Sequence, residues 1–313
     1  MRRPRFGEPR FLAEVSTRTD NACHRLVPSP ELNDMVLGVI GRAQEHYNLN
    51  IHGFVFMSNH YHMLVTAADA DTLASFICFI NTNVAKEINR NDGVRGHVWG
   101  RRFSGIPFTG EDAAQVSRLR YILAHGVKER LVQRVHEWPG ATSLPWLLDG
   151  EPLVGTWRDR TAEYFARRRK RWKETEMADF ATQYTLRMAP LPCWADLPPS
   201  DWRRFVAAMV DEIEAELLAE LEGETPPQIL GAAAVMARDP WAVPPRSKRS
   251  PCPAVHAASA IERRRWHARW RELQASYANA AAQFRDGDYG VEFPMGTFRP
   301  DGGFVPWPPV SGA

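Results

Sequence analysis

Two histidines separated by one residue stand in an apolar stretch of the chain. His60 and His62 flank Tyr61 within the run MSNHYHMLV. On a β-strand the side chains of residues i and i+2 project from the same face, so both imidazoles would project together while Tyr61 points away. Neutral imidazole is a common ligand of divalent metals, so the pair is suited to form half of a metal site. The alternative is a pair of surface histidines on a solvated sheet face, and the motif alone does not separate the two.

A second pair stands on a predicted helix further along the chain. Tyr121 and His125 are four residues apart, which places both on one face of a helix. The basic residues around them are Arg118, Arg120, Lys128 and Arg130. Their charge favours an anion near Tyr121 and predicts a lowered pKa for its phenol. For a single helical tyrosine the alternative is a half-buried core residue with a solvated hydroxyl.

The strands that would carry the first pair are indicated by short apolar runs. Alternating or continuous apolar residues predict strands at 11–16, 51–57 and 60–66, with a turn at 58–59 between the last two. A further extended piece is expected at 103–108. Strands this short and closely connected are typical of an antiparallel sheet.

Three helices are expected between and after these strands. Ser29 followed by Pro30 predicts the start of the first helix, and Asp71 is expected to cap the second. The third, at about 111–124, carries Tyr121. This order predicts an α+β fold with helices packed on an antiparallel sheet, in a domain spanning residues 1–150.

Composition sets limits on function. The chain has 313 residues, 44% of them hydrophobic and 24% charged, which is typical of a globular protein with one or two domains. Its net charge is only +2, so DNA binding would need local positive charge. No apolar run approaches the roughly 18 residues of a membrane span, and the basic N-terminus has no secretory signal pattern. Four dispersed cysteines without a CxxC pair argue against a zinc ribbon and fit a reducing, cytoplasmic location.

The second half, residues 151–313, has a different character. A basic run with one tryptophan occupies 167–173, and Ser200 is expected to cap an acidic helix. Residues 239–253 are basic and rich in proline, which indicates a linker or an extended arm, and an arginine-rich helix is expected at about 258–284. We therefore predict a mainly α-helical, Pro- and Trp-rich extension that binds DNA or a partner.

Four motifs together resemble a known family. GFVFMSNHYHMLV resembles the MPNHxHLLL signature of HUH endonucleases, as found in single-tyrosine transposases of the REP-associated (RAYT) kind. RLRYILAHGVKERLV is similar to the YIxxNPVRAGLV helix of that family, which carries the nucleophilic tyrosine. VWGRRFSGIPF and EWPGATSLPW are similar to pieces that stand in the same order. The resemblance covers about residues 8–147, and beyond residue 160 it extends only to long members, through RSPCPAVH and FPMGTFRP.

The resemblance implies a ferredoxin- or RRM-like HUH fold and a set of site residues. His60 and His62 correspond to the metal ligands, and Tyr121 to the nucleophile. One turn after the tyrosine the better-known members have Asn or Gln, whereas this chain has His125, followed by Gly126 where Pro is common. A third imidazole is either a metal ligand or a base for Tyr121. The implied cofactor is a divalent ion, Mg²⁺ or Mn²⁺; three nitrogens favour Mn²⁺, Zn²⁺ or Co²⁺ over Mg²⁺.

The implied activity is metal-dependent nicking and strand transfer on single-stranded hairpin DNA through a 5′-phosphotyrosine. The predicted DNA contacts are Arg101, Arg102, Arg118, Arg120, Lys128, Arg168, Arg169 and Arg171. Trp172, Trp266 and Trp270 are candidates for stacking on unpaired bases or, for the last two, core residues. A homodimer is compatible with one nucleophilic tyrosine per chain, and neither a nucleotide cofactor nor a membrane partner is expected.

Two other functions are compatible with the sequence. Because His125 and Gly126 depart from the family pattern, the protein could be a regulator of the same fold that binds DNA hairpins with weak or no catalytic activity. More distantly, it could be a metal-stabilised scaffold that binds a protein partner through its acidic helix.

Overall fold

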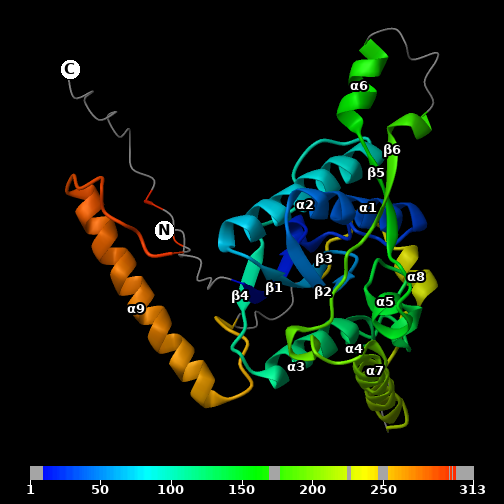
Figure 1. Cartoon of the computed structure of the whole chain (residues 1–313). Helices are drawn as coiled ribbons and strands as arrows, with labels where there is room; N and C mark the ends of the chain where they lie inside the picture. The colour runs from blue at the N-terminus through cyan, green and yellow to red at the C-terminus, as the bar shows by residue number, and fades with distance from the viewer. Residues whose placement is uncertain are drawn as a thin grey trace.

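The centre of the molecule is a four-stranded antiparallel sheet with the strand order β2-β3-β1-β4. The structure is a computed structural model that describes residues 10–168, 177–223, 227–245, 253–295, 297 and 299–300. The four strands are β1 (Phe11–Arg18), β2 (Leu49–Phe56), β3 (His60–Ala67) and β4 (Ser104–Pro107). The predicted antiparallel sheet is confirmed, and β4 forms one of its edges (Figure 1).

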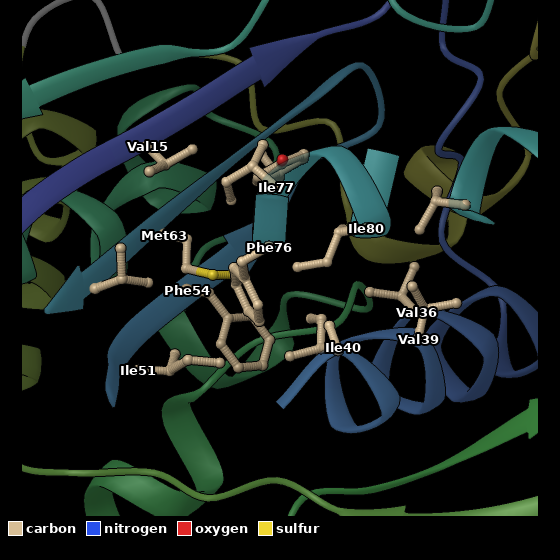
Figure 2. Packing of buried hydrophobic residues seen from close by; sticks show 14 of the residues in the cluster. Val15, Val36, Val39, Ile40, Ile51, Phe54, Met63, Phe76, Ile77 and Ile80 are labelled. Carbon is tan, nitrogen blue, oxygen red and sulfur yellow. The ribbon is translucent and has the colours of Figure 1, made fainter. Parts of the chain in front are cut away.

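Two helices, α1 (Pro30–His46) and α2 (Ala70–Asn91), cover one face of the sheet (Figure 1). Their apolar sides meet the inward side chains of the strands in a core from which water is excluded. Figure 2 shows Phe54 and Met63 of the sheet packed against Ile40 of α1 and Phe76 of α2. All four of these side chains are fully buried. Each buried side chain of this size contributes about 1.5–3 kcal/mol to stability.

The other face of the sheet carries a second core. Its helices are α3 (Asp112–Leu123), α4 (His125–Lys128), α5 (Leu144–Asp149) and α7 (Pro199–Leu221). Leu64 of β3, Leu119 of α3 and Val206 of α7 are fully buried in this core. The sheet is therefore a middle layer between two sets of helices, as the arrangement in Figure 1 shows. The two cores lie on opposite faces of the same strands.

The second half contains a two-stranded antiparallel sheet that the sequence analysis did not predict. Strands β5 (Val154–Arg158) and β6 (Ala181–Thr185) pair antiparallel, and β5 packs against α1. Leu153 and Leu186, beside these strands, are buried in the core with α1 and α2. Contacts between the two halves of the chain therefore extend into the core.

The remaining described helices confirm the helical character of the second half. They are α6 (Arg160–Arg168), α8 (Ala232–Met236) and α9 (Ala260–Arg285). On α9 Trp266 is buried and stacks on Trp270, with ring centroids 5.4 Å apart. Among the described helices, none combines the length and the apolar character needed to cross a lipid bilayer. Residues 169–176 and 246–252, which include most of the predicted basic run and part of the predicted linker, lie outside the described residues.

Two predicted helix caps were wrong. Asp69, rather than Asp71, caps α2: its backbone is extended and its side chain accepts a hydrogen bond from the Thr72 amide. Asp71 lies in the first turn instead. Ser200 lies inside α7, because Pro198 takes the cap position and Pro199 the first helical position, where its fixed φ and missing N–H are tolerated.

A glycine at the contact between α1 and β5 provides a test of this packing. A Cβ added to Gly38 would overlap the backbone carbonyl of Thr156 and lie 2.5 Å from the amide nitrogen of Trp157. Alanine favours a helix by about 1 kcal/mol over glycine, but overpacking against rigid backbone costs about 1–3 kcal/mol. Because the overlap is with backbone atoms, we expect a cost in the upper part of this range, so that Gly38→Ala lowers the free energy of unfolding in urea by about 1–2 kcal/mol.

Gly110 supplies the control for this substitution. An added Cβ there has no neighbour within 4 Å, so Gly110→Ala should leave the unfolding free energy within about 0.5 kcal/mol of the parent value. Equal stability of the two variants would contradict the close approach of β5 to α1.

Candidate active site

Three histidines converge on the face of the sheet that α3 and α4 cover. On β3, Tyr61 and Met63 are buried on the side of α1 and α2, so alternation directs His60 and His62 to the opposite side. His125 is the first residue of α4 and is buried. The ring centroids of the three imidazoles lie 4.8–5.2 Å apart. The structure therefore brings together all three residues that were predicted as metal ligands.

The distances between the imidazole nitrogens suit a single metal ion. Any two of the three ligand atoms lie within 4.8 Å of each other. His60 Nε2 and His125 Nε2 are 2.9 Å apart. In tetrahedral coordination with metal–nitrogen bonds of about 2.0–2.1 Å, two nitrogens on one ion lie about 3.3 Å apart. Three imidazoles with this spacing fit a divalent transition ion better than Mg²⁺, which prefers oxygen.

Hydrogen bonds orient two of the three rings. His60 Nδ1 lies 2.6 Å from Asn59 Oδ1, and His62 Nδ1 lies 2.7 Å from Glu14 Oε1. Because both partners are oxygens that accept, each Nδ1 carries the hydrogen and each Nε2 keeps a lone pair for a metal. His125 Nδ1 is buried and has no hydrogen-bond partner within the described part of the chain.

The protonation state of the cluster also favours metal binding. Burial, together with the neighbouring His125 and His62 rings, holds the pKa of His60 well below its ordinary value. Burial is also the main cause that lowers the pKa of His125 to about 3. Both rings are therefore neutral at pH 7, which is the form that binds metals.

A buried carboxylate that the sequence analysis missed lies behind the histidines. Glu14 of β1 contacts His62, and its Oε1 also accepts a hydrogen bond of 2.7 Å from Arg118 Nη2. His256 Nε2, from the second half of the chain, lies 2.5 Å from Glu14 Oε2. Burial alone would raise the pKa of Glu14, but contacts with His256, His62 and Arg118 outweigh it and the pKa is lowered. The signal in the sequence was one acidic residue between Ala13 and Val15 in a predicted strand.

Tyr121 packs directly on the histidine cluster. Its ring centroid lies 5.1 Å from that of His125 and 5.4 Å from that of His62. Arg118 Cζ lies 3.9 Å, and Lys128 Nζ 5.1 Å, from the centroid of the same ring. The predicted lowering of the pKa of Tyr121 is wrong: burial of the half-buried phenol raises it, and this effect exceeds the opposite effect of Arg118.

The predicted DNA contacts are divided between two sides of the molecule. Arg118, Arg120 and Lys128 share α3 and α4 with Tyr121; Arg118 pairs with Glu14, and Arg120 pairs with Glu216 at 2.7 Å. Arg168 ends α6, on the side of the sheet opposite to α3 (Figure 1), and its guanidinium contacts Tyr164. Arg169, Arg171 and Trp172 lie outside the described residues.

Arg101 and Arg102 lie near the histidine end of the sheet. Both are exposed and follow Gly100, whose amide donates a hydrogen bond to the Arg18 carbonyl. Arg18 stands opposite His60 in the register of β1 and β3. The two arginines therefore follow a residue that is hydrogen-bonded to the end of β1 opposite His60.

Comparison with known proteins points to one family. Residues 24–125 match the family model described as IS200-like transposases, which confirms over these residues the resemblance to single-tyrosine transposases. This segment includes Tyr121 and all three histidines of the cluster. No curated protein sequence matches the chain.

Two solved structures are similar to part of the chain. One is a REP-associated tyrosine transposase bound to a REP hairpin, 17% identical, covering 46% of this chain and 82% of that chain with a TM-score of 0.39. The other is a protein described as a transposase from Deinococcus radiodurans R1, 14% identical, covering 38% of this chain and 94% of that chain with a TM-score of 0.28.

Removal of the third imidazole distinguishes a ligand from a base at position 125. We expect His125→Ala to weaken Mn²⁺ binding by more than about 100-fold, because even loss of an outer-shell partner of a metal ligand costs about 10–100-fold. Isothermal titration of the metal-free protein measures this. His136→Ala, at an exposed histidine away from the cluster, should bind as the parent does. Unchanged affinity in His125→Ala would show that His125 is not a ligand.

Proposed function

Because residues 24–125 match IS200-like transposases, we propose that the protein is a metal-dependent endonuclease and strand transferase of single-stranded DNA. Tyr121 is its nucleophile. The observation that carries this proposal is the direct packing of the Tyr121 ring on two of three converging imidazoles. A nucleophile beside a cation site is the arrangement that phosphodiester cleavage by a phenol requires.

The reaction is a displacement at phosphorus. The Tyr121 oxygen forms a bond to the phosphorus, the bond from phosphorus to the 3′ oxygen breaks, and the phenol proton passes to solvent or a base. The leaving 3′ oxygen takes up a proton, while the 5′-phosphate stays on the tyrosine. The covalent bond retains the energy of the broken one, so a second 3′-hydroxyl can reverse the step and join a new strand without ATP.

The residues of this chain supply charge and position to that step. Arg118 lies against the Tyr121 ring and Lys128 near it, so both stabilise negative charge on the phenol and on the phosphate. Burial raises the pKa of Tyr121, which makes these cations necessary rather than incidental. A divalent ion held by His60, His62 and His125 would withdraw charge from a non-bridging phosphate oxygen.

The substrate class follows from access to Tyr121. The half-buried ring lies between α3 and the sheet, so a phosphate on a single strand reaches it more easily than one within a duplex. The sequence resemblance to REP-associated transposases favours a single strand beside a hairpin. Exposed Arg101, Arg102 and Lys128 are candidate contacts for the backbone phosphates.

The nucleophile is tested by a covalent adduct on a denaturing gel. Hairpin oligonucleotides with single-stranded 5′ flanks, including DNA that flanks the gene, are incubated with Mn²⁺ or EDTA. A 3′ label should appear in a slow band that contains protein, and a 5′ label in a shorter fragment with a free 3′-hydroxyl. We expect both products with Mn²⁺, neither with EDTA, and neither from Tyr121→Phe, which lacks the attacking oxygen.

Tyr164→Phe is the matched control, because Tyr164 is exposed on α6, away from the cluster. It should form the adduct as the parent does. An adduct from Tyr121→Phe would contradict the assignment of the nucleophile. Hairpin binding without any adduct from the parent would instead support the regulator that binds without catalysis, and absence of salt-sensitive DNA binding would support the protein scaffold.

The phosphate contacts are tested by the salt dependence of binding. For single strands the slope of log K against log salt changes by about 0.7 for each phosphate contact. We expect Arg101→Gln/Arg102→Gln to weaken hairpin binding and to reduce the slope by about 1.4, as measured by fluorescence anisotropy. Arg204→Gln/Arg285→Gln removes the same charge from two other exposed arginines and should keep the slope. Equal slopes in the two double variants would exclude contacts by Arg101 and Arg102.

A further inference from the structure

A segment of the second half returns to the edge of the catalytic sheet. The chain that leads into α9 passes beside β4 (Figure 1), and His256 forms a parallel bridge with Phe108, directly after β4. The His256 amide donates to the Pro107 carbonyl, and the Thr109 amide donates to the His256 carbonyl, both at 2.9 Å. The segment therefore extends the sheet beyond its edge strand.

A carboxylate fixes the same segment two residues further on. The amides of Ala258 and Ser259 each donate a hydrogen bond of 2.9 Å to the side chain of Glu111. Ser259 then caps α9 by accepting from the Glu262 amide. Backbone contacts on one side and Glu111 on the other fix the segment, and the His256 side chain is buried.

The His256 side chain ends on the carboxylate that orients His62. Its Nε2 lies 2.5 Å from Glu14 Oε2, while Glu14 Oε1 accepts from His62 Nδ1 at 2.7 Å. The Glu14 side chain is 3% exposed and that of His256 is 8% exposed, so water does not replace either contact. The two atoms lie within ion-pair distance, although the angles between the groups are not those of a regular hydrogen bond.

We propose that His256 is a positioning residue for the metal centre and that the C-terminal half thereby completes the site. With His256 packed against one oxygen, rotation of the Glu14 carboxylate is restricted, and its other oxygen stays on His62 Nδ1. His62 is then kept in the tautomer that directs the Nε2 lone pair to the cluster. This inference rests on the proposed metal centre; His256 itself faces Glu14 and is not one of the clustered ligands.

The first measurement is the affinity for Mn²⁺ alone, by isothermal titration of full-length protein. We expect His256→Ala to bind about 10–100-fold more weakly than the parent, the usual effect of removing an outer-shell partner. His256→Gln keeps an N–H donor for Glu14 and should stay within a few-fold of the parent. His267→Ala removes an exposed histidine of α9 and should not change the affinity.

The second measurement separates positioning from general damage. Nitrogen-15 NMR of the metal-free protein should show His62 as the Nδ1–H tautomer in the parent, His256→Gln and His267→Ala, and a mixture of tautomers in His256→Ala. Parent-like affinity in His256→Ala overturns the inference, as does an equal loss in His256→Ala and His256→Gln, which indicates a structural role. If the parent itself does not bind Mn²⁺, the proposed metal centre fails and the inference fails with it.

Discussion

The buried carboxylate of Glu14 is the charge on which the arrangement of the site depends. A carboxylate at 3% exposure is stable only when its oxygens are matched by donors, and removing one partner of such a buried pair typically costs about 3–5 kcal/mol. Its partners are His62, Arg118 and His256, from β3, α3 and the segment before α9. Because one carboxylate contacts all three, β3, α3 and the segment before α9 are held in a common geometry.

The alternation of β3 makes the same strand serve the core and the site. Tyr61 is fully buried on the side of α1 and α2, where its hydroxyl donates a hydrogen bond of 2.8 Å to Asn81. A shift of the strand by one residue would turn His60 and His62 into that core and turn Tyr61 to the opposite face, beside His125. The cost of misplacing Tyr61 and its apolar neighbours therefore fixes the histidines, although the histidines themselves contribute little to the core.

Local periodicity explains how much of the site could be predicted from the sequence. The two-residue period of a strand places His60 and His62 on one face, and the helical period does the same for Tyr121 and His125. Each pair can therefore be recognised from residues at most four positions apart. Their convergence, however, came from the family resemblance and not from either period. The helix caps were wrong where two aspartates or two prolines stood close together, as at Asp69 and Asp71, because only backbone geometry decides between them.

Contacts between distant parts of the chain could not be predicted in this way. Glu14 lies within a correctly predicted strand, yet its partners become visible only once β1, β3 and α3 are assembled. The two-stranded sheet of β5 and β6 was missed because each strand has only five residues, and its stability comes from packing on α1.

The position of the half-buried Tyr121 shows why these distant contacts matter for chemistry. Burial raises the pKa of the phenol, whereas a cation close to the ring acts in the opposite direction. Arg118 is one such cation, and it is also a partner of Glu14, so its position over Tyr121 is set by the same carboxylate that orients His62. His62 on β3 and Arg118 over the Tyr121 ring are thus held by one shared carboxylate. Since His256 Nε2 lies 2.5 Å from the remaining carboxylate oxygen, the second half of the chain contributes to this cluster as well as to both cores.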